Sequence, residues 1–294
     1  MSFFTRSKMK LFSLSLLLFV VVGAFVVNGV FQRQATQAAH AISPLSVYVG
    51  SGDNNVYAFN STNGVRYWSY PTAGSVSTKP AYANGMVYVG SNDGYVYALN
   101  ATTGALAWRY NIGIVEGSPV VSQGIVYVGS GMCYFYALNA KTGKLIWRFA
   151  HDITSSGCDH PLGTPAVFNG IVYVAGFSTN SMYALDAKTG AIIWQTQLNG
   201  SSSPVIVNGT LYTGPYALNT STGEILWRAN IDSLIINESG QPVVAYGMVY
   251  LSTGFGDLGD DLYAIDEITG AIRWIVPGDF EFSSPYAYKG VVYI

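Results

Sequence analysis

Charged side chains are scarce in this chain of 294 residues. Lysine and arginine contribute 14 residues and aspartate and glutamate 16, which together make up 10% of the sequence and leave a net charge of −2. A chain with so little net charge gives no electrostatic reason to expect nucleic acid or an anionic membrane surface as a partner.

Cysteine and helical periodicity are also nearly absent. The two cysteines exclude a disulfide-rich scaffold and any zinc or iron–sulfur site built from several thiolates. No segment after residue 41 keeps a 3.6-residue hydrophobic period, which excludes a helical solenoid. The chain is instead rich in tyrosine and glycine, with 22 and 33 residues. This composition is typical of short strands joined by tight turns.

An eleven-residue pattern, Ala-x-Asn/Asp-x-x-Thr-Gly-x-x-x-Trp, occurs six times and contains every tryptophan of the chain. Residues 98–108 are one copy, and in the first copy Asn63 replaces the threonine. Repetition of this kind indicates a fold built from similar units. The last position of the six copies is Trp68, Trp108, Trp147, Trp194, Trp227 and Trp274, and the glycines are Gly64, Gly104, Gly143, Gly190, Gly223 and Gly270.

Each repeat from residue 46 onward reads as four strands. In the second repeat these are residues 79–83, 86–90, 95–99 and 105–110, separated by two to five turn residues. The Val-Tyr-Val-Gly signature of the second strand recurs at spacings of 40, 39, 46, 39 and 38 residues. The sequence therefore predicts an all-β fold, a β-propeller of four-stranded antiparallel blades, with six repeats visible and a partial seventh.

The repeated residues have structural roles on this interpretation. The Asn or Asp accepts backbone hydrogen bonds that form the turn, and the glycine closes it with a positive φ. The alanine lets a neighbouring blade approach. The tryptophan fills the gap between blades while its N–H finds a carbonyl. We expect the six tryptophans and six glycines to dock blades, because a binding site does not need six equivalent copies.

The N-terminus differs from the repeats. Arg6, Lys8 and Lys10 precede an almost wholly apolar run at residues 11–30. This pattern is typical of an export signal or a membrane anchor, and 39–41 fits a cleavage site. Residues 1–41 are therefore expected to be a signal peptide or anchor, with 42–294 as the propeller. Either way the propeller is expected outside the cytoplasm, secreted, periplasmic or anchored through 11–30.

Two interruptions of the repeat hold polar groups. The loop at 254–261 contains Asp257, Asp260 and Asp261, which could hold calcium, although a solvated acidic loop is the simpler interpretation. The 150–163 interruption contains Cys158 with histidine and aspartate neighbours. A disulfide from Cys158 to Cys133, free thiols, and a metal or catalytic site remain alternatives there.

Blade five and the C-terminal repeat also depart from the pattern. Blade five has almost no turn around Pro215, so short strands or a tight corner are expected there. Residues 283–294 begin a further repeat. Either the chain is part of a propeller with seven or eight blades, or 284–288 pairs near Ser46 and closes a ring of six.

The segment 87–108 resembles the pyrroloquinoline-quinone-like (PQQ-like) propeller repeat, and the resemblance extends over nearly all of 46–294. Quinone-dependent alcohol and sugar dehydrogenases, the outer-membrane barrel-assembly lipoprotein and propellers of unassigned role share this repeat. The dehydrogenases imply PQQ with calcium and a catalytic aspartate, but no residue here matches those positions or the vicinal cysteines of that branch. The lipidated cysteine of the barrel-assembly branch is absent too.

The sequence therefore favours a non-catalytic scaffold that binds other envelope or extracellular proteins or a ligand, with no catalytic or cofactor-binding residue assigned. The alternative is part of a PQQ-dependent alcohol or sugar dehydrogenase. Membrane contact is expected only through the N-terminal segment.

Overall fold

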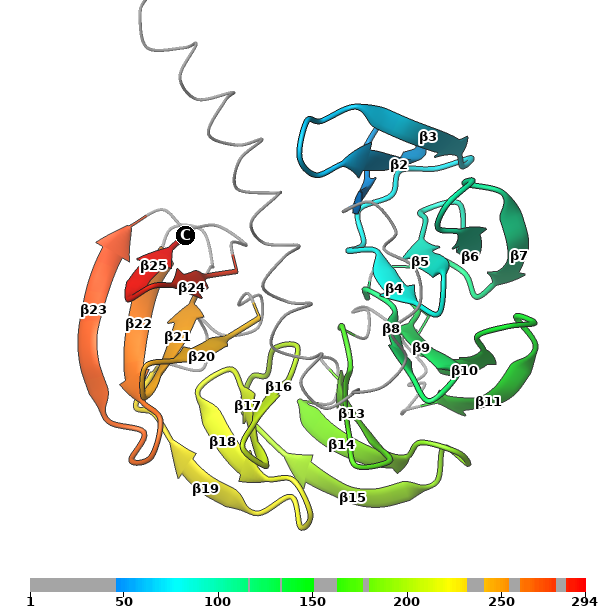
Figure 1. Cartoon of the computed structure of the whole chain (residues 1–294). Coiled ribbons are helices and arrows are strands. Elements are labelled where there is room, and N and C mark those ends of the chain that lie inside the picture. The colour runs from blue at the N-terminus through cyan, green and yellow to red at the C-terminus, as the bar shows by residue number, and fades with distance from the viewer. Residues whose placement is uncertain are drawn as a thin grey trace, which may run out of the picture.

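The computed structural model describes residues 46–115, 117–132, 134–150, 163–176, 180–231, 241–253, 260–278 and 284–294. These residues form seven antiparallel sheets, and the predicted β-propeller is confirmed. Six of these sheets are blades, and the seventh is a two-stranded hairpin. Figure 1 shows the blades around a common centre, with the first strand of a blade inside and the last strand at the rim.

Blade one has three strands, and each of the next two blades has four. The bounds are β1 (Ser46–Gly50), β2 (Asn55–Asn60), β3 (Arg66–Pro71); β4 (Ala81–Ala83), β5 (Met86–Gly90), β6 (Tyr95–Asn100), β7 (Leu106–Asn111); β8 (Val120–Ser122), β9 (Ile125–Gly129), β10 (Tyr134–Asn139) and β11 (Leu145–Ala150).

Blades four to six also have four strands, and a two-stranded hairpin follows them. The bounds are β12 (Ala166–Phe168), β13 (Ile171–Gly176), β14 (Ser181–Asp186), β15 (Ile192–Gln197); β16 (Val205–Val207), β17 (Thr210–Thr213), β18 (Tyr216–Asn219), β19 (Ile225–Arg228); β20 (Val243–Ala245), β21 (Met248–Ser252), β22 (Asp260–Asp266), β23 (Ile272–Gly278); β24 (Tyr286–Tyr288) and β25 (Val291–Tyr293).

Turn chemistry sets the strand order within a blade. Asn84 and Gly85 join β4 to β5 with φ values of 51° and 77°. Two successive positive φ angles match the right-handed twist of a tight hairpin. The other first turns have the same pair of positive φ angles at Gln123–Gly124, Asn169–Gly170, Asn208–Gly209, Tyr246–Gly247 and Lys289–Gly290.

The first strands are shorter than the sequence predicts. β4 begins at Ala81 rather than at Lys79 because Pro80 has no N–H for the ladder. The predicted short strands of blade five are confirmed, since β17 and β18 have four residues each. Gly214, with φ 47°, and Pro215 make the tight turn between them.

Buried side chains gather between neighbouring blades rather than within one sheet. One cluster joins Tyr88, Val96 and Trp108 of blade two to Val128 and Leu138 of blade three. Comparable clusters occupy the other junctions. Each blade is therefore stabilised mainly by the blades beside it.

The last hairpin is separate from blade one. β24 pairs with β25 at Tyr286 and Tyr293, and β1 pairs with β2. The alternative in which 284–288 pairs near Ser46 is therefore not the pairing observed.

In the described part of the chain, no helix is long and apolar enough to cross a membrane. The predicted signal or anchor at 1–41 lies outside the described residues.

Candidate functional site

The strand order gives the propeller two different faces. One face, called the turn face below, carries the turns between first and second strands and those between third and fourth strands. The other, called the loop face, carries the turns between second and third strands and the connections from one blade to the next.

The turn face is regular from blade to blade. The turn between β6 and β7 is held by Asn100, whose Oδ1 accepts the N–H groups of Thr102 and Thr103 at 3.0 and 2.9 Å. Gly104 closes it with φ 72°. We call this five-residue segment the docking turn. Its Ala101 N–H donates to the carbonyl of Gly85 at 2.9 Å, which ties the two turns of the blade together.

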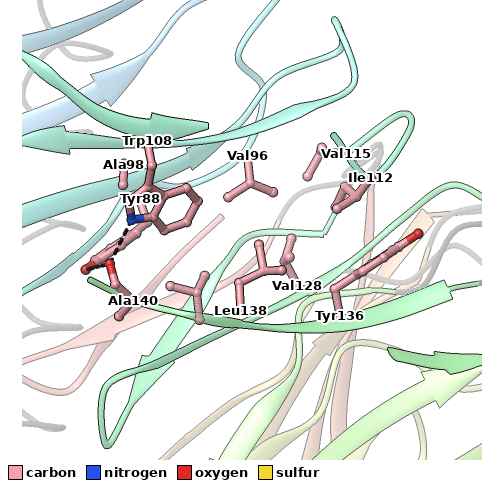
Figure 2. Close-up of a cluster of buried hydrophobic side chains, with 11 residues drawn as sticks. Tyr88, Val96, Ala98, Trp108, Ile112, Val115, Val128, Tyr136, Leu138 and Ala140 are labelled. Carbon is pink, nitrogen blue, oxygen red and sulfur yellow. Dashed lines mark hydrogen bonds between the residues drawn. The ribbon is translucent and has the colours of Figure 1, made fainter. Parts of the chain in front are cut away.

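Each docking turn of blades two to six receives the tryptophan of the preceding blade. Trp108 Nε1 donates to the carbonyl of Ala140 at 2.9 Å, and the Tyr88 hydroxyl donates to the same oxygen at 3.1 Å (Figure 2). The indole also lies so close to Gly143 that a Cβ there would be 2.6 Å from Trp108 Cδ2. The glycine is therefore required by its positive φ and by the close approach of the ring.

The same pairing joins all the blades from one to six. The tryptophan-to-carbonyl bonds are Trp68 to Ala101 (2.9 Å), Trp147 to Ala187 (3.0 Å), Trp194 to Thr220 (2.9 Å) and Trp227 to Glu267 (3.1 Å). The glycines under these rings are Gly104, Gly190, Gly223 and Gly270.

Two of the predicted docking residues lack this contact among the described residues. Gly64, in the docking turn of blade one, has no heavy atom within 4 Å of a built Cβ. Trp274 is 41% exposed, whereas Trp108 is 8% exposed. No described carbonyl accepts its Nε1–H.

The junction of blades five and six is a variant. Glu267 replaces the alanine or threonine of the docking turn, and the Tyr212 hydroxyl approaches its carboxylate at 3.5 Å. Burial raises the pKa of Tyr212 to about 12, and the Glu267 charge adds to that effect. Asp266, in the same docking turn, lies 2.7 Å from the guanidinium of Arg273 on β23. The hydrogen bond from Arg273 is the main reason that the pKa of the Asp266 carboxyl is below its usual value.

The loop face joins blades through polar contacts. The carboxylate of Asp93 accepts the backbone N–H of Ala73 from blade one at 2.9 Å and the Tyr97 hydroxyl at 2.6 Å. Burial, followed by the Asp93 hydrogen bond, raises the pKa of Tyr97 to about 12. The Ser91 hydroxyl donates to the Gly74 carbonyl at 3.0 Å.

A ladder of hydroxyl groups circles the axis at the loop face. Each first strand from β4 onward is preceded by a proline, and at four of the five steps between these strands the residue before the proline donates its N–H to its counterpart in the next unit. Between Ser203 and Gln241 the contact is different, because Gln241 Nε2 donates to the carbonyl of Pro204 at 3.4 Å. Lys79 N–H donates to Ser118 Oγ at 2.8 Å, Ser118 N–H to Thr164 Oγ1 at 3.0 Å, and Thr164 N–H to Ser203 Oγ at 3.0 Å. Further round, Gln241 N–H donates to Ser284 Oγ at 3.2 Å.

Sequence reasoning missed this ladder. Its signal in the sequence is a proline at one fixed place in each repeat after the first. The residue before that proline is serine or threonine in four of the six cases. Lys79 is the charged member of the set. Its side chain keeps solvent contact, yet burial among neighbouring groups lowers the pKa of its amine. Solvent contact together with a lowered pKa is expected of a side chain that lies near the axis with blades around it.

The residues singled out in the interrupted loops are only partly described. Cys133, Cys158, the other polar groups of 151–162 and Asp257 lie outside the described residues, and of Asp260 only the backbone is described. Asp261 holds the Tyr263 hydroxyl at 3.3 Å. The described residues contain no group of three or more His, Cys, Asp or Glu side chains placed to hold a metal ion.

The connections that depart from the repeat in length all join strand ends that lie at the loop face. Residues 151–162, 232–240 and 279–283 link last strands to first strands, and 254–259 links β21 to β22. The ends of all these strands lie at the loop face. The docking turns of the opposite face keep their five-residue length throughout. Variation in the length of the connections is therefore confined to connections whose flanking strand ends lie at the loop face.

Comparison with known proteins agrees with this architecture. The family model described as outer membrane protein assembly factor BamB matches residues 30–113, 92–215 and 200–293. The chain belongs to this family. No curated protein matches this BamB-family chain.

Solved structures of the same fold include a BamB and two enzymes. BamB from Moraxella catarrhalis is 19% identical with a TM-score of 0.68, over 85% of this chain and 81% of that one. A europium-containing methanol dehydrogenase is 15% identical with a TM-score of 0.66, over 85% and 72%. The quinohemoprotein alcohol dehydrogenase from Comamonas testosteroni is 16% identical with a TM-score of 0.63, over 81% and 60%. At these identities the likeness shows the fold alone.

The described axial residues do not fit a quinone with calcium. The positions that meet at the axis supply four hydroxyls, one amide and the Lys79 ammonium, with no carboxylate. Calcium prefers several carboxylate or carbonyl oxygens, and proton abstraction from an alcohol needs a base. We therefore derive no reaction step through that cofactor.

Proposed function

We propose that this BamB-family chain is a non-catalytic scaffold outside the cytoplasm that binds other envelope proteins through its loop face. The observation that carries the proposal is the difference between the two faces. The turn face repeats one docking geometry, whereas the connections of irregular length all join strand ends at the loop face. Binding residues lie disproportionately on variable loops that a rigid scaffold positions.

Export and location are part of the same proposal. The basic residues followed by the apolar run at 11–30 support residues 1–41 as a signal peptide or an anchor, with 42–294 as the propeller. The family description, an outer membrane protein assembly factor, supports an envelope location. A reporter enzyme active only outside the cytoplasm, fused after residue 45, tests this part. A reporter that stays inactive contradicts it.

Affinity capture from envelope extracts tests the binding face. Lys79 lies at the loop face and Asn208 at the turn face, and both are exposed. A partner bound at the loop face should be lost with Lys79→Glu, which reverses a charge there, and retained with Asn208→Glu. Loss with Asn208→Glu alone, or no partner above background, contradicts the proposal.

An activity assay separates the scaffold from a quinone-dependent dehydrogenase. The full-length protein is mixed with PQQ and calcium, and dye reduction is followed with alcohols and sugars. We expect no dye reduction and no change in the quinone absorbance. Quinone-dependent turnover would show that the chain is an enzyme.

A further inference from the structure

Acceptor motifs for N-linked sugars occur six times in this chain, and the fold places them in very different surroundings. The motif is asparagine, any residue except proline, and then serine or threonine. Its asparagines are Asn60, Asn100, Asn199, Asn208, Asn219 and Asn237. The last of these lies outside the described residues. A transferase that acts on the folded chain must reach both the asparagine and the hydroxyl of the motif, so the other five can be compared.

Three of the five asparagines form docking turns. Oδ1 of Asn100 accepts the N–H of Thr102 at 3.0 Å and that of Thr103 at 2.9 Å. Asn60 and Asn219 hold their turns in the same way. To enter the active site of a transferase, each of these amides would have to leave its arrangement, and the docking turn would then lose the acceptor that forms it.

The motif at Asn199 is blocked at its serine. Asn199 itself is exposed, in the connection from β15 to β16 at the loop face. Ser201 is 1% exposed, and its Oγ is buried. Because the motif requires serine or threonine, this hydroxyl has to be recognised, and a transferase cannot reach it in the folded chain. The Asn199 N–H also donates to the Tyr216 hydroxyl at 3.0 Å, which holds the segment in place.

Asn208 differs from the other four asparagines in both respects. With Gly209 it forms the two-residue turn between β16 and β17 at the turn face, with φ values of 50° and 80°. Its side chain is exposed, and no described group hydrogen-bonds to its amide. Thr210, which supplies the hydroxyl of the motif, is partly exposed at the first position of β17. The Thr220 hydroxyl fixes the turn, because it donates to the Gly209 carbonyl at 2.8 Å.

We propose that Asn208 is an N-glycosylation site of the exported chain. The proposal rests on the export proposed above, because acceptor motifs of this kind are modified in secreted proteins. Nδ2 of Asn208 attacks the anomeric carbon of a sugar that is carried on a lipid phosphate. The bond from Nδ2 to that carbon forms, and the bond from the carbon to the phosphate oxygen breaks. The amide proton passes to a base of the transferase, and the lipid phosphate leaves.

The position of Asn208 is compatible with the scaffold function. An N-linked sugar is bulky and hydrophilic and lies at the protein surface. Asn208 lies at the turn face, so a sugar there leaves the loop face free to bind a partner.

The chain supplies matched turns that lack the motif. Asn84 and Asn169 have the same positive φ and the same following glycine as Asn208, and both are exposed. Met86 and Ile171 stand where Thr210 follows Asn208. Asparagine, turn and exposure are therefore the same in three blades, and only the hydroxyl residue distinguishes blade five.

The test is mass spectrometry of the full chain isolated from the producing cells, with fragmentation that locates a sugar on one residue. We expect a sugar on Asn208, with Asn100 and Asn199 unmodified. Asn208→Gln and Thr210→Val should each lose that sugar completely. Thr210→Ser keeps a hydroxyl at the third position of the motif and should retain the sugar.

Two variants that create a motif test whether the fold selects the site. Met86→Thr completes the motif at Asn84, in the first turn of blade two, and should add a sugar there. Lys141→Thr completes it at Asn139, whose Oδ1 accepts two N–H groups at 3.1 and 2.9 Å in a docking turn, and should add none. Circular dichroism confirms that both variants are folded.

The reporter fused after residue 45 distinguishes failure of export from failure of this inference. If the reporter is active outside the cytoplasm and Asn208 carries no sugar, the inference is overturned and the exported scaffold stands. Sugars on the docking-turn asparagines, including Asn139 in Lys141→Thr, also overturn it, because the fold would then not select the site. An inactive reporter overturns both proposals.

Discussion

Gly104→Ala and Gly64→Ala form a matched pair that measures what the tryptophan–glycine contact contributes to stability. The two glycines occupy the same position of the docking turn, with φ 72° and 71°. An alanine in this region costs about 1–2 kcal/mol in backbone strain at either site. At Gly104 the added Cβ would also lie 2.7 Å from Cδ2 of Trp68, whereas at Gly64 it meets nothing.

Trp68 cannot move away freely, because its Nε1 is bonded to Ala101 at 2.9 Å. Overpacking of this kind costs about 1–3 kcal/mol. We therefore expect Gly104→Ala to be less stable than Gly64→Ala by about 1–3 kcal/mol. For a domain of this size the difference lowers the melting temperature by about 2–12 °C.

The assay is thermal and urea unfolding of both variants and the wild type at one protein concentration. Coincidence of fluorescence and circular dichroism checks that one transition is measured. If Gly64→Ala destabilises as much as Gly104→Ala, backbone strain explains the whole effect and the proposed docking role is refuted.

Three further predictions concern the same contacts. Trp108→Phe removes one buried hydrogen-bond donor and should lower the free energy of unfolding by about 1–2 kcal/mol beyond the loss of ring area. Trp274→Phe, at an exposed tryptophan, should change stability little, and urea unfolding midpoints compare the two variants. Ser118→Ala leaves the Lys79 N–H without its acceptor and should cost about 1 kcal/mol; an unchanged midpoint contradicts the role of the ladder. The pKa values of Tyr97 and Tyr212, raised to about 12 in the folded chain, predict that stability falls as pH rises from 10 to 12, because the unfolded chain loses these protons first; a flat profile there contradicts the predicted burial effect.

The fold was predictable because every blade uses the same local signals. Asn84–Gly85 marks a hairpin turn by itself, and the pattern from Ala98 to Trp108 marks the last two strands. The predicted start of the first strand of blade two, at Lys79, was wrong by two residues, because Pro80 has no N–H to donate to the ladder.

The axial ladder could not be recognised so easily, because its members differ in residue type. Ser118, Thr164 and Gln241 share a position before proline, but only the ring arrangement brings residues about forty positions apart together. The unmatched state of Gly64 and Trp274 was equally hidden. Both occupy their repeat positions, and only the order of the blades in space shows that neither has its usual neighbour among the described residues.

Photo-crosslinking from both faces in the producing cells tests the central claim most directly. Asn92 and Met132 are exposed in second turns of the loop face, and Asn208 and Ile268 are exposed on the turn face. A photoreactive residue is placed at each position in turn. We predict crosslinks to another envelope protein from Asn92 or Met132 and none from Asn208 and Ile268. Crosslinks from the turn face alone would contradict the assignment of the loop face as the binding surface.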